Sequence, residues 1–170
     1  MSSIAERVRS VLRRSARGLW LSHRAPAQGW LLARMLGWRL VLPVLKRIVP
    51  LSSLVRLMWS DGRLPVDRDA VVRLAELAYK PRPDGARGNC LERSLVAYRY
   101  LAQVRADPTL VVGVDRSGGG VRGHVWVLVD GVPVHDSPER VDRHTALVCF
   151  GPGGIRTGTG GGSALPLARA

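Results

Sequence analysis

The chain has 170 residues, of which 46% are apolar and two are cysteines. It can therefore form one domain with a buried core, and it is neither a disordered chain nor a disulfide framework. Its formal charge is +13, and residues 1–60 hold +10 of it, as eleven Lys/Arg against a single acid, Glu6; this fits nucleic acid, an anionic membrane surface, an acidic partner, or simply a solvated face rich in arginine.

Residues 1–60 are predicted to form a basic helical region that packs on or beside the core. Apolar residues at helical spacing, with arginines opposite, predict an amphipathic helix over residues 3–21. The segment "HRAPAQG" at 23–29 predicts a break, and a second helix is expected over 30–42. Two prolines predict short or kinked helices over 43–59.

The same region bears on localisation. No apolar run approaches the ~18 residues of a membrane-spanning helix, because Arg34, Arg39, Lys46, Arg47 and Arg56 interrupt the most apolar part. The first residues also lack the pattern of a secretory signal peptide. We therefore expect a cytoplasmic protein with reduced thiols, for which peripheral contact with a membrane stays open.

Residues 61–150 are expected to form the core domain. A helix is predicted over 67–79, with Asp67 or Asp69 as its cap, and another over 90–103. Strand-like segments follow at 109–114, 123–131, 132–136 and 145–150. Helices first and antiparallel strands second predict an α+β fold. The tail at 151–170 is so rich in Gly that we expect it to be disordered.

The segment "GNCLERS" places one of the two cysteines at the start of a predicted helix. If Asn89 is the N-cap, Cys90 is the first helical residue and Glu92 the third, an arrangement that resembles a capping box. The helix dipole would then favour the thiolate of Cys90 over its thiol, and the thiolate is the nucleophilic form. A lone cysteine is more often an inert buried residue, and Cys149, inside "ALVCF", fits that description better.

The segment "GHVWVLVDGVPVHD" predicts a hairpin around Asp130-Gly131. A three-residue loop, Val129 to Gly131, would pair Leu128 with Val132 and place His124 opposite Asp136, close enough for a carboxylate to hold an imidazole. A two-residue loop would put the two side chains on opposite faces. Two-residue loops with Asp-Gly are common, so both registers stay open, and the His124–Asp136 pair requires the three-residue loop.

Cys90, His124 and Asp136 would then form a Cys-His-Asp triad, in which His124 takes the thiol proton and Asp136 fixes its tautomer. Trp126 shares the face of His124 and would wall the site or fill the core. Arg122 could meet a substrate carboxylate, although a solvated arginine is the simpler interpretation. Of the other histidines, His135 is expected at the surface, and His23 and His144 have no evident partner.

Several segments together resemble a known family, the transglutaminase-like leader peptidases of lasso-peptide biosynthesis. The similar segments, in the family's order and spacing, are "CLERSL" at 90–95, "LVVGV" at 110–114, "GHVWVLVDG" at 123–131 and Asp136. The Pro-punctuated apolar segment at 39–58 is also similar to the one that precedes the protease core there, so the resemblance spans roughly residues 30–150. The chain departs from the family pattern at Val125, where Ala is expected, and at Asn89, where Pro or Arg is frequent.

The resemblance implies a transglutaminase-like, papain-like cysteine protease fold, with Cys90 as nucleophile, His124 as base and Asp136 as orienting acid. It implies hydrolysis of one peptide bond that frees a core peptide from its leader, after which an ATP-dependent cyclase closes a macrolactam. It also implies a small companion protein that holds the leader, since the first 80 residues leave no room for a β-rich recognition domain. No cofactor and no nucleic acid are expected.

Three other interpretations remain open from the residues alone. A zinc site could use Cys90, His124 and Asp136 or Cys149, but zinc sites usually show paired ligands at short spacing, which this sequence lacks. A non-enzymatic protein could bind nucleic acid or membrane through the basic half, with steep salt dependence. A transglutaminase-like amide transferase would use the same triad with an amine in place of water.

Overall fold

A computed structural model describes residues 4–79, 89–115 and 120–159, with side chains from residue 26 to residue 158. The helices are α1 (Ile4–Ile48), α2 (Leu51–Met58), α3 (Arg68–Ala78), α4 (Cys90–Gln103) and α5 (Pro138–Asp142), with a 3-10 turn η1 (Pro152–Gly154). The strands are β1 (Thr109–Asp115), β2 (Arg122–Val129), β3 (Val132–Pro133), β4 (Thr145–Phe150) and β5 (Arg156–Thr159). They form one sheet in the order β3-β2-β1-β4-β5, in which every pairing is antiparallel.

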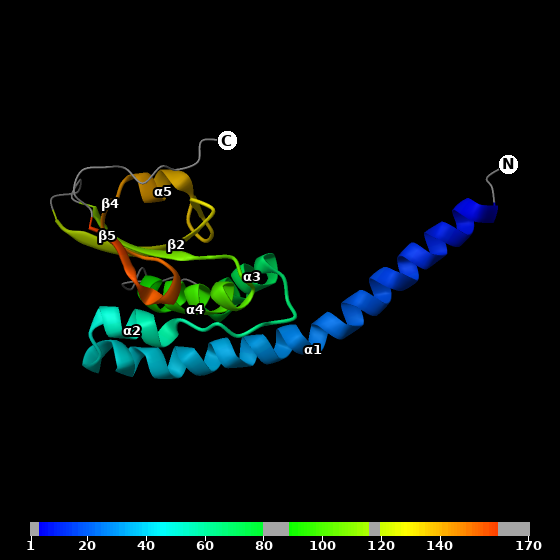
Figure 1. The fold of residues 1–170 in the computed structure, drawn as a ribbon, viewed down its shortest axis with the longest axis horizontal. Coiled ribbons are helices and arrows are strands. Elements are labelled where there is room, and N and C mark those ends of the chain that lie inside the picture. Colours follow the sequence, from blue (N-terminus) through cyan, green and yellow to red (C-terminus); the bar gives the residue numbers. More distant parts are fainter. Residues whose placement is uncertain (1–3, 80–88, 116–119, 160–170) are drawn as a thin grey trace.

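The helices cover the two faces of the sheet unequally. Figure 1 shows α1 to α4 stacked below the sheet and the short α5 above it. The α+β class predicted from the sequence is confirmed, as a set of helices with a small antiparallel sheet. None of the helices in the described ranges is both long and apolar enough to cross a bilayer.

Side chains on β2 alternate between two cores, as expected for a strand covered on both faces. Val125, Val127 and Val129 belong to the large core beneath the sheet, which also holds Leu31 and Met35 of α1. The opposite face contributes Trp126 and Leu128 to a smaller core with Val111, Val141 of α5 and Cys149. His124 is buried at the start of the strand, in line with Trp126 and Leu128.

The predicted break at 23–29 is wrong, because α1 runs without interruption from Ile4 to Ile48 and contains both Pro26 and Pro43. A proline removes one hydrogen bond of a helix and bends it, but a helix with enough flanking turns continues through it. The chain leaves the helical path only after Ile48, and α2 begins at Leu51 with Pro50 as its N-cap. The third predicted helix is confirmed: the Asp67 side chain accepts a hydrogen bond from the Ala70 N–H at 2.7 Å and caps α3.

The tail prediction is wrong for residues 151–159. These residues form η1 and the edge strand β5, which pairs with β4. The Tyr98 hydroxyl of α4 donates to the Gly151 carbonyl and accepts from the Gly154 N–H at 3.0 Å, so contacts with the core order a segment whose composition predicts disorder. The rest of the tail lies outside the described residues.

Candidate active site

Cys90 is the first residue of α4, as the sequence predicts, and its side chain is partly buried. The predicted capping box is wrong. Asn89 makes no side-chain capping bond, and the Glu92 carboxylate turns to Lys46 of α1, with Oε1 and Nζ 2.7 Å apart. The Glu92 carboxylate, which the local pattern predicts to cap α4, therefore forms a tertiary ion pair instead.

The start of α4 lies against the start of β2. The Ser94 hydroxyl, one turn beyond Cys90, donates to the Val125 carbonyl at 2.9 Å and fixes the helix to the strand. The Cys90 thiol contacts the imidazole of His124 and accepts hydrogen bonds from the backbone N–H groups of Leu91 and Val125. The nucleophile candidate and the base candidate thus come from adjacent elements.

His124 and Asp136 also meet, with His124 Nε2 and Asp136 Oδ1 3.2 Å apart and both side chains almost fully buried. The ring N–H does not point directly at the oxygen, so the contact is chiefly electrostatic. With Nε2 turned to the carboxylate, Nδ1 is the nitrogen left for the thiol. Cys90, His124 and Asp136 therefore lie in series.

The hairpin has the two-residue loop, the register that was expected to separate His124 from Asp136. Val129 pairs with Val132 across a two-residue turn at Asp130-Gly131, where both φ angles are positive, 53° and 77°. The three-residue loop is therefore wrong. The expectation that a two-residue loop puts the two side chains on opposite faces does not apply to Asp136, however. β3 ends at Pro133, and the following residues leave the strand pattern. The chain then folds back and brings the carboxylate to His124.

Two arginines that the sequence analysis missed complete the surroundings of Asp136. Arg93 Nη2 donates to Asp136 Oδ2 at 3.0 Å, and Arg140 Nε lies 3.6 Å from Asp136 Oδ1. Both had a signal in the spacing: Arg93 is three residues after Cys90 on the same helix face, and Arg140 is four residues after Asp136.

These contacts set the protonation states. Contact with the Asp136 carboxylate, and then with Cys90, raises the pKa of His124 to about 9 despite the cost of burial. Burial alone would raise the pKa of the Cys90 thiol, but the contact with His124 and two backbone N–H groups together lower it. Burial would likewise raise the pKa of Asp136, but His124, Arg93 and Arg140 hold it below its ordinary value. The arrangement favours a thiolate–imidazolium pair beside an ionised carboxylate.

Two rings lie beside the imidazole of His124, those of Trp126 and His144. The Trp126 ring stacks on the His124 ring with centroids 5.9 Å apart and planes 20° apart. His144, for which no partner was evident in the sequence, lies 5.0 Å from His124 by centroid, and its Nδ1–H donates to the Arg140 carbonyl oxygen at 2.8 Å. Trp126 is buried, whereas Arg122 is exposed two residues before His124 on the same strand. His23 lies outside the described side chains.

The remaining candidates differ in their surroundings. His135 is not at the surface: its side chain is 1% exposed and lies beside Glu76 of α3. Cys149 is buried in the smaller core, and burial raises the pKa of its thiol. Across the described ranges, no three His, Cys, Asp or Glu side chains are grouped so as to hold a metal ion.

A thiolate paired with an imidazolium, with the imidazolium oriented by a carboxylate, can attack a carbonyl carbon and protonate a leaving amine. Comparison with known proteins agrees with this chemistry at the level of the superfamily. A family model described as "Transglutaminase-like superfamily" matches residues 30–149, whereas no curated protein and no solved structure matches the chain. Members of that superfamily are often cysteine-dependent enzymes. The matched residues run from the docked part of α1 to β4 and include Cys90, His124 and Asp136, and the chain belongs to the transglutaminase-like superfamily.

Proposed function

We propose that this protein is a cysteine peptidase that removes the leader from a ribosomally made lasso-peptide precursor. The observation that carries the peptidase part is the series Cys90, His124 and Asp136, with the pKa of His124 raised to about 9 and that of Cys90 lowered. The lasso-peptide part is supported by the resemblance of the segments around these residues to the leader peptidases of that pathway.

In the proposed reaction, Cys90 Sγ attacks the scissile carbonyl and His124 donates its proton to the leaving amine. As donors to the developing oxyanion we propose the N–H groups of Leu91 and Val125, which donate toward the sulfur. Water, deprotonated by the now neutral His124, then attacks the carbonyl carbon of the Cys90 thioester. The C–S bond breaks, which releases the acid and restores the Cys90 thiolate beside the imidazolium. The freed amine is the new N-terminus on which an ATP-dependent cyclase would form a macrolactam.

The test is incubation with the precursor and its leader-binding companion protein, followed by mass spectrometry. We expect one cleavage, lost in Cys90→Ala and retained in Cys149→Ala, which removes the other thiol. Equal cleavage by Cys90→Ala would reject the nucleophile assignment. Adding a primary amine separates hydrolysis from amide transfer, because an amide-transferase product would carry the mass of the amine.

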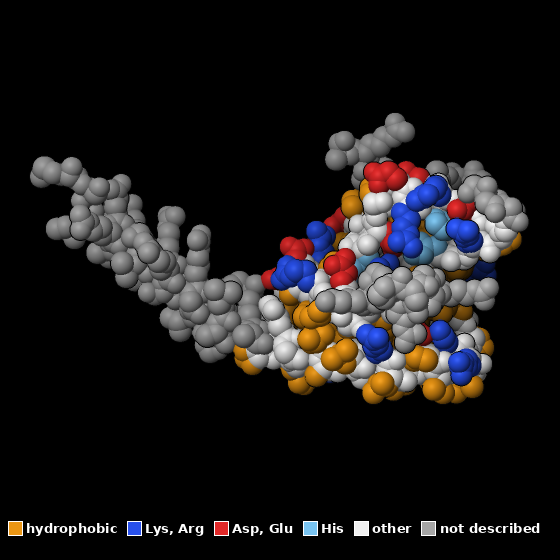
Figure 2. Space-filling view, turned by 180° about the vertical axis from the view of Figure 1, so that it is seen from behind, with side chains coloured by type: hydrophobic (Ala, Val, Ile, Leu, Met, Phe, Trp, Pro, Cys, Tyr) orange, Lys and Arg blue, Asp and Glu red, His pale blue; other side chains and the backbone are white. Residues whose placement is uncertain are grey.

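A second candidate function, binding to an anionic membrane surface, is favoured by the outward face of α1. Its exposed apolar side chains follow one another at helical spacing: Leu36, Leu40, Val41, Val44 and Ile48. Figure 2 shows such side chains along the lower edge of the molecule, with Lys and Arg among them. Residues 7–60 contain no acid, and apolar and basic residues together are what an anionic bilayer surface binds.

Flotation with vesicles tests this candidate. We expect binding to phosphatidylglycerol vesicles but not to phosphatidylcholine vesicles, and its loss in a variant combining L40S, V44S and I48S. Leu57→Ser, which removes an exposed apolar side chain from α2, serves as the control. Binding that survives the triple change, or that moves to DNA with a steep salt dependence, would reject the membrane assignment.

A further inference from the structure

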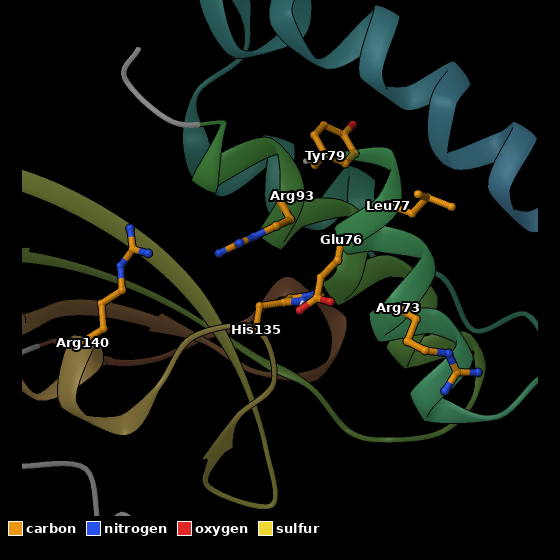
Figure 3. Close-up of a pocket in the computed structure, with 7 residues that line it drawn as sticks. All are labelled: Arg73, Glu76, Leu77, Tyr79, Arg93, His135 and Arg140. Carbon is orange, nitrogen blue, oxygen red and sulfur yellow. Dashed lines mark ion pairs between the residues drawn. The ribbon is translucent and has the colours of Figure 1, made fainter. Parts of the chain in front are cut away.

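Arg93 connects the carboxylate of Asp136 to the helix that carries the candidate nucleophile. It lies three residues beyond Cys90 on α4, about 4.5 Å along the helix axis. Its Nη2 donates to Asp136 Oδ2 at 3.0 Å, and its side chain is only 13% exposed. Figure 3 shows this side chain extended from α4 toward Arg140. Both ends of the series Cys90, His124 and Asp136 are therefore attached to one helix.

No regular element fixes the side chain of Asp136. The residue lies between β3 and α5, in a segment that belongs to neither. Among the described residues, Arg93 makes the one contact with this carboxylate that has hydrogen-bond geometry. His124 Nε2 and Arg140 Nε lie 3.2 Å and 3.6 Å from Oδ1, and neither is aligned for a hydrogen bond. The bond from Arg93 therefore determines which way the carboxylate points.

The two arginines beside Asp136 differ in the strength of their contact. Arg93 is nearly buried, where a charge-assisted hydrogen bond is strong. The Arg140 side chain is 57% exposed and approaches through Nε alone, so solvent weakens its attraction. Burial raises the pKa of Asp136, but His124, then Arg93 and last Arg140 hold it down. Arg140 therefore serves as the comparison for Arg93, with the same charge beside the same carboxylate but no hydrogen bond.

We propose that Arg93 is a positioning residue of the site, which holds one oxygen of Asp136 so that the other faces His124. The proposal rests on the proposed peptidase function. Arg93 acts through Asp136, because the carboxylate orients the ring of His124 and the ring pairs with Cys90. A carboxylate that turns away leaves the imidazolium without its partner while the leaving amine is protonated. Such a loss lowers kcat and leaves KM nearly unchanged.

The first experiment measures cleavage of the precursor, with its companion protein present, by Arg93→Ala. We expect kcat about thirtyfold lower and KM within about twofold of the parent, as for a lost charge-assisted hydrogen bond that acts in the transition state. Arg140→Ala should lower kcat about threefold or less, as for a weak, half-exposed ion pair. Parent kcat in Arg93→Ala, or equal losses in the two variants, overturns the proposal.

Free guanidinium tests the position of the charge directly. Arg93 lines a cavity of about 510 Å³, so a small planar cation can enter the space that Arg93→Ala leaves. We expect guanidinium chloride at about 50 mM, far below a denaturing concentration, to raise the kcat of this variant about fivefold. Neither the parent nor Arg63→Ala, which changes an exposed arginine, should respond. No recovery with guanidinium, or equal recovery with sodium chloride, overturns the proposal.

Arg93→Lys replaces Arg93→Ala if the alanine variant does not fold. Lysine keeps the charge, but its nitrogen ends one bond short of the position of Arg93 Nη2. The carboxylate of Asp136 must then move toward α4 to stay bonded, and we expect kcat about threefold to tenfold lower. In that case, parent kcat in Arg93→Lys overturns the proposal.

The second experiment needs no substrate. In a Cys149→Ala background, the pH midpoint of Cys90 alkylation by iodoacetamide should lie about one unit higher in Arg93→Ala than in the parent. The reason is that a loosened Asp136 stabilises the imidazolium less, and the imidazolium stabilises the thiolate less. Arg140→Ala should move the midpoint by less than half as much. An unchanged midpoint in Arg93→Ala overturns the proposal.

The two experiments also separate this proposal from the peptidase function. A parent protein that cleaves no peptide rejects the peptidase function, and the alkylation midpoint still tests the link from Arg93 to Cys90. Cleavage that depends on Cys90, with parent kcat and an unchanged midpoint in Arg93→Ala, keeps the peptidase function and rejects the positioning role.

Discussion

The carboxylate of Asp136 is shared between two roles, one for each oxygen. Oδ2 is held by Arg93, and Oδ1 faces His124 Nε2 with Arg140 nearby. A carboxylate buried beside an imidazole alone would be inclined to take a proton, but the arginines keep its pKa low. The ionised group can then orient the ring and stabilise its charged form, which is what a triad requires of its third member.

The same reasoning predicts the reactivity of Cys90. The rate of alkylation by iodoacetamide should rise with pH around a midpoint below ~8.5, the value of a free cysteine, because the pKa of the thiol is lowered. In His124→Ala the midpoint should move upward, since burial then acts on the thiol without the ring. The measurement is made in a Cys149→Ala background, so that one thiol reports. An unchanged midpoint would show that His124 does not activate the sulfur.

At the scale of elements, the sequence predicted the helix that begins at Cys90, the position of β2 and the turn at Asp130-Gly131, because apolar periodicity, alternation and Asp-Gly turns are local signals. It could not predict the ion pair of Glu92 with Lys46, which is some forty residues away in the sequence. It also could not show that β3 ends after two residues, so a correct residue pair was inferred from a wrong register. Tertiary contacts decided both.

Gly113 of β1, next to a bulge against β4, leaves room for the ring of Trp126, which stacks on His124. Gly113 pairs with Ala146, and a Cβ there would lie 2.7 Å from Trp126 Cη2 and 2.8 Å from the Thr145 carbonyl oxygen. Because the backbone oxygen cannot move aside, we expect Gly113→Ala to lower the free energy of unfolding by about 1–3 kcal/mol in urea titrations. Gly123→Ala on β2, where a Cβ meets nothing within 4 Å, is the control. Equal stability of the two variants would contradict this account.

The ion pair between α1 and α4 makes a further prediction. Glu92 is buried and Lys46 is partly exposed, so Lys46→Met leaves a buried carboxylate without its partner. We expect a loss of about 2 kcal/mol, most of it recovered when Glu92→Gln is added. Arg47→Met, a neighbouring exposed change, should stay within ~0.5 kcal/mol in the same urea assay. A double variant no more stable than Lys46→Met would show that the pair is not the cause.

On the scale of the whole molecule, the candidate site lies where the layers meet. Cys90 comes from the helical layer, His124 from the sheet, and Asp136 from the segment that leads to α5 on the other face. No local window of sequence contains all three, so order and spacing along the chain could nominate them but not place them. Because only folding brings these three ionisable groups into contact, the stability of the fold and the charge state of the site are coupled.

This coupling predicts how stability depends on pH. Below about pH 6.5, the ordinary pKa of histidine, His124 is protonated in the folded and unfolded chains, and its contact with Asp136 stabilises the fold in full. As pH rises toward the folded pKa of about 9, the contribution is lost. At the acid end, the contribution is lost as pH falls below ~3.9 and through the lowered pKa of Asp136.

We therefore expect the difference in unfolding free energy between the parent and Asp136→Asn to be greatest near pH 5–6.5. It should shrink by about 2–3 kcal/mol by pH 9 and beyond. The loss of the Arg93 partner adds an offset that stays constant in this range, because arginine does not titrate there. Urea unfolding at unit steps from pH 5 to pH 10 measures the difference, with Asp69→Asn, an exposed carboxylate on α3, as control. A difference that grows with pH would mean that His124 is not held as an imidazolium by Asp136.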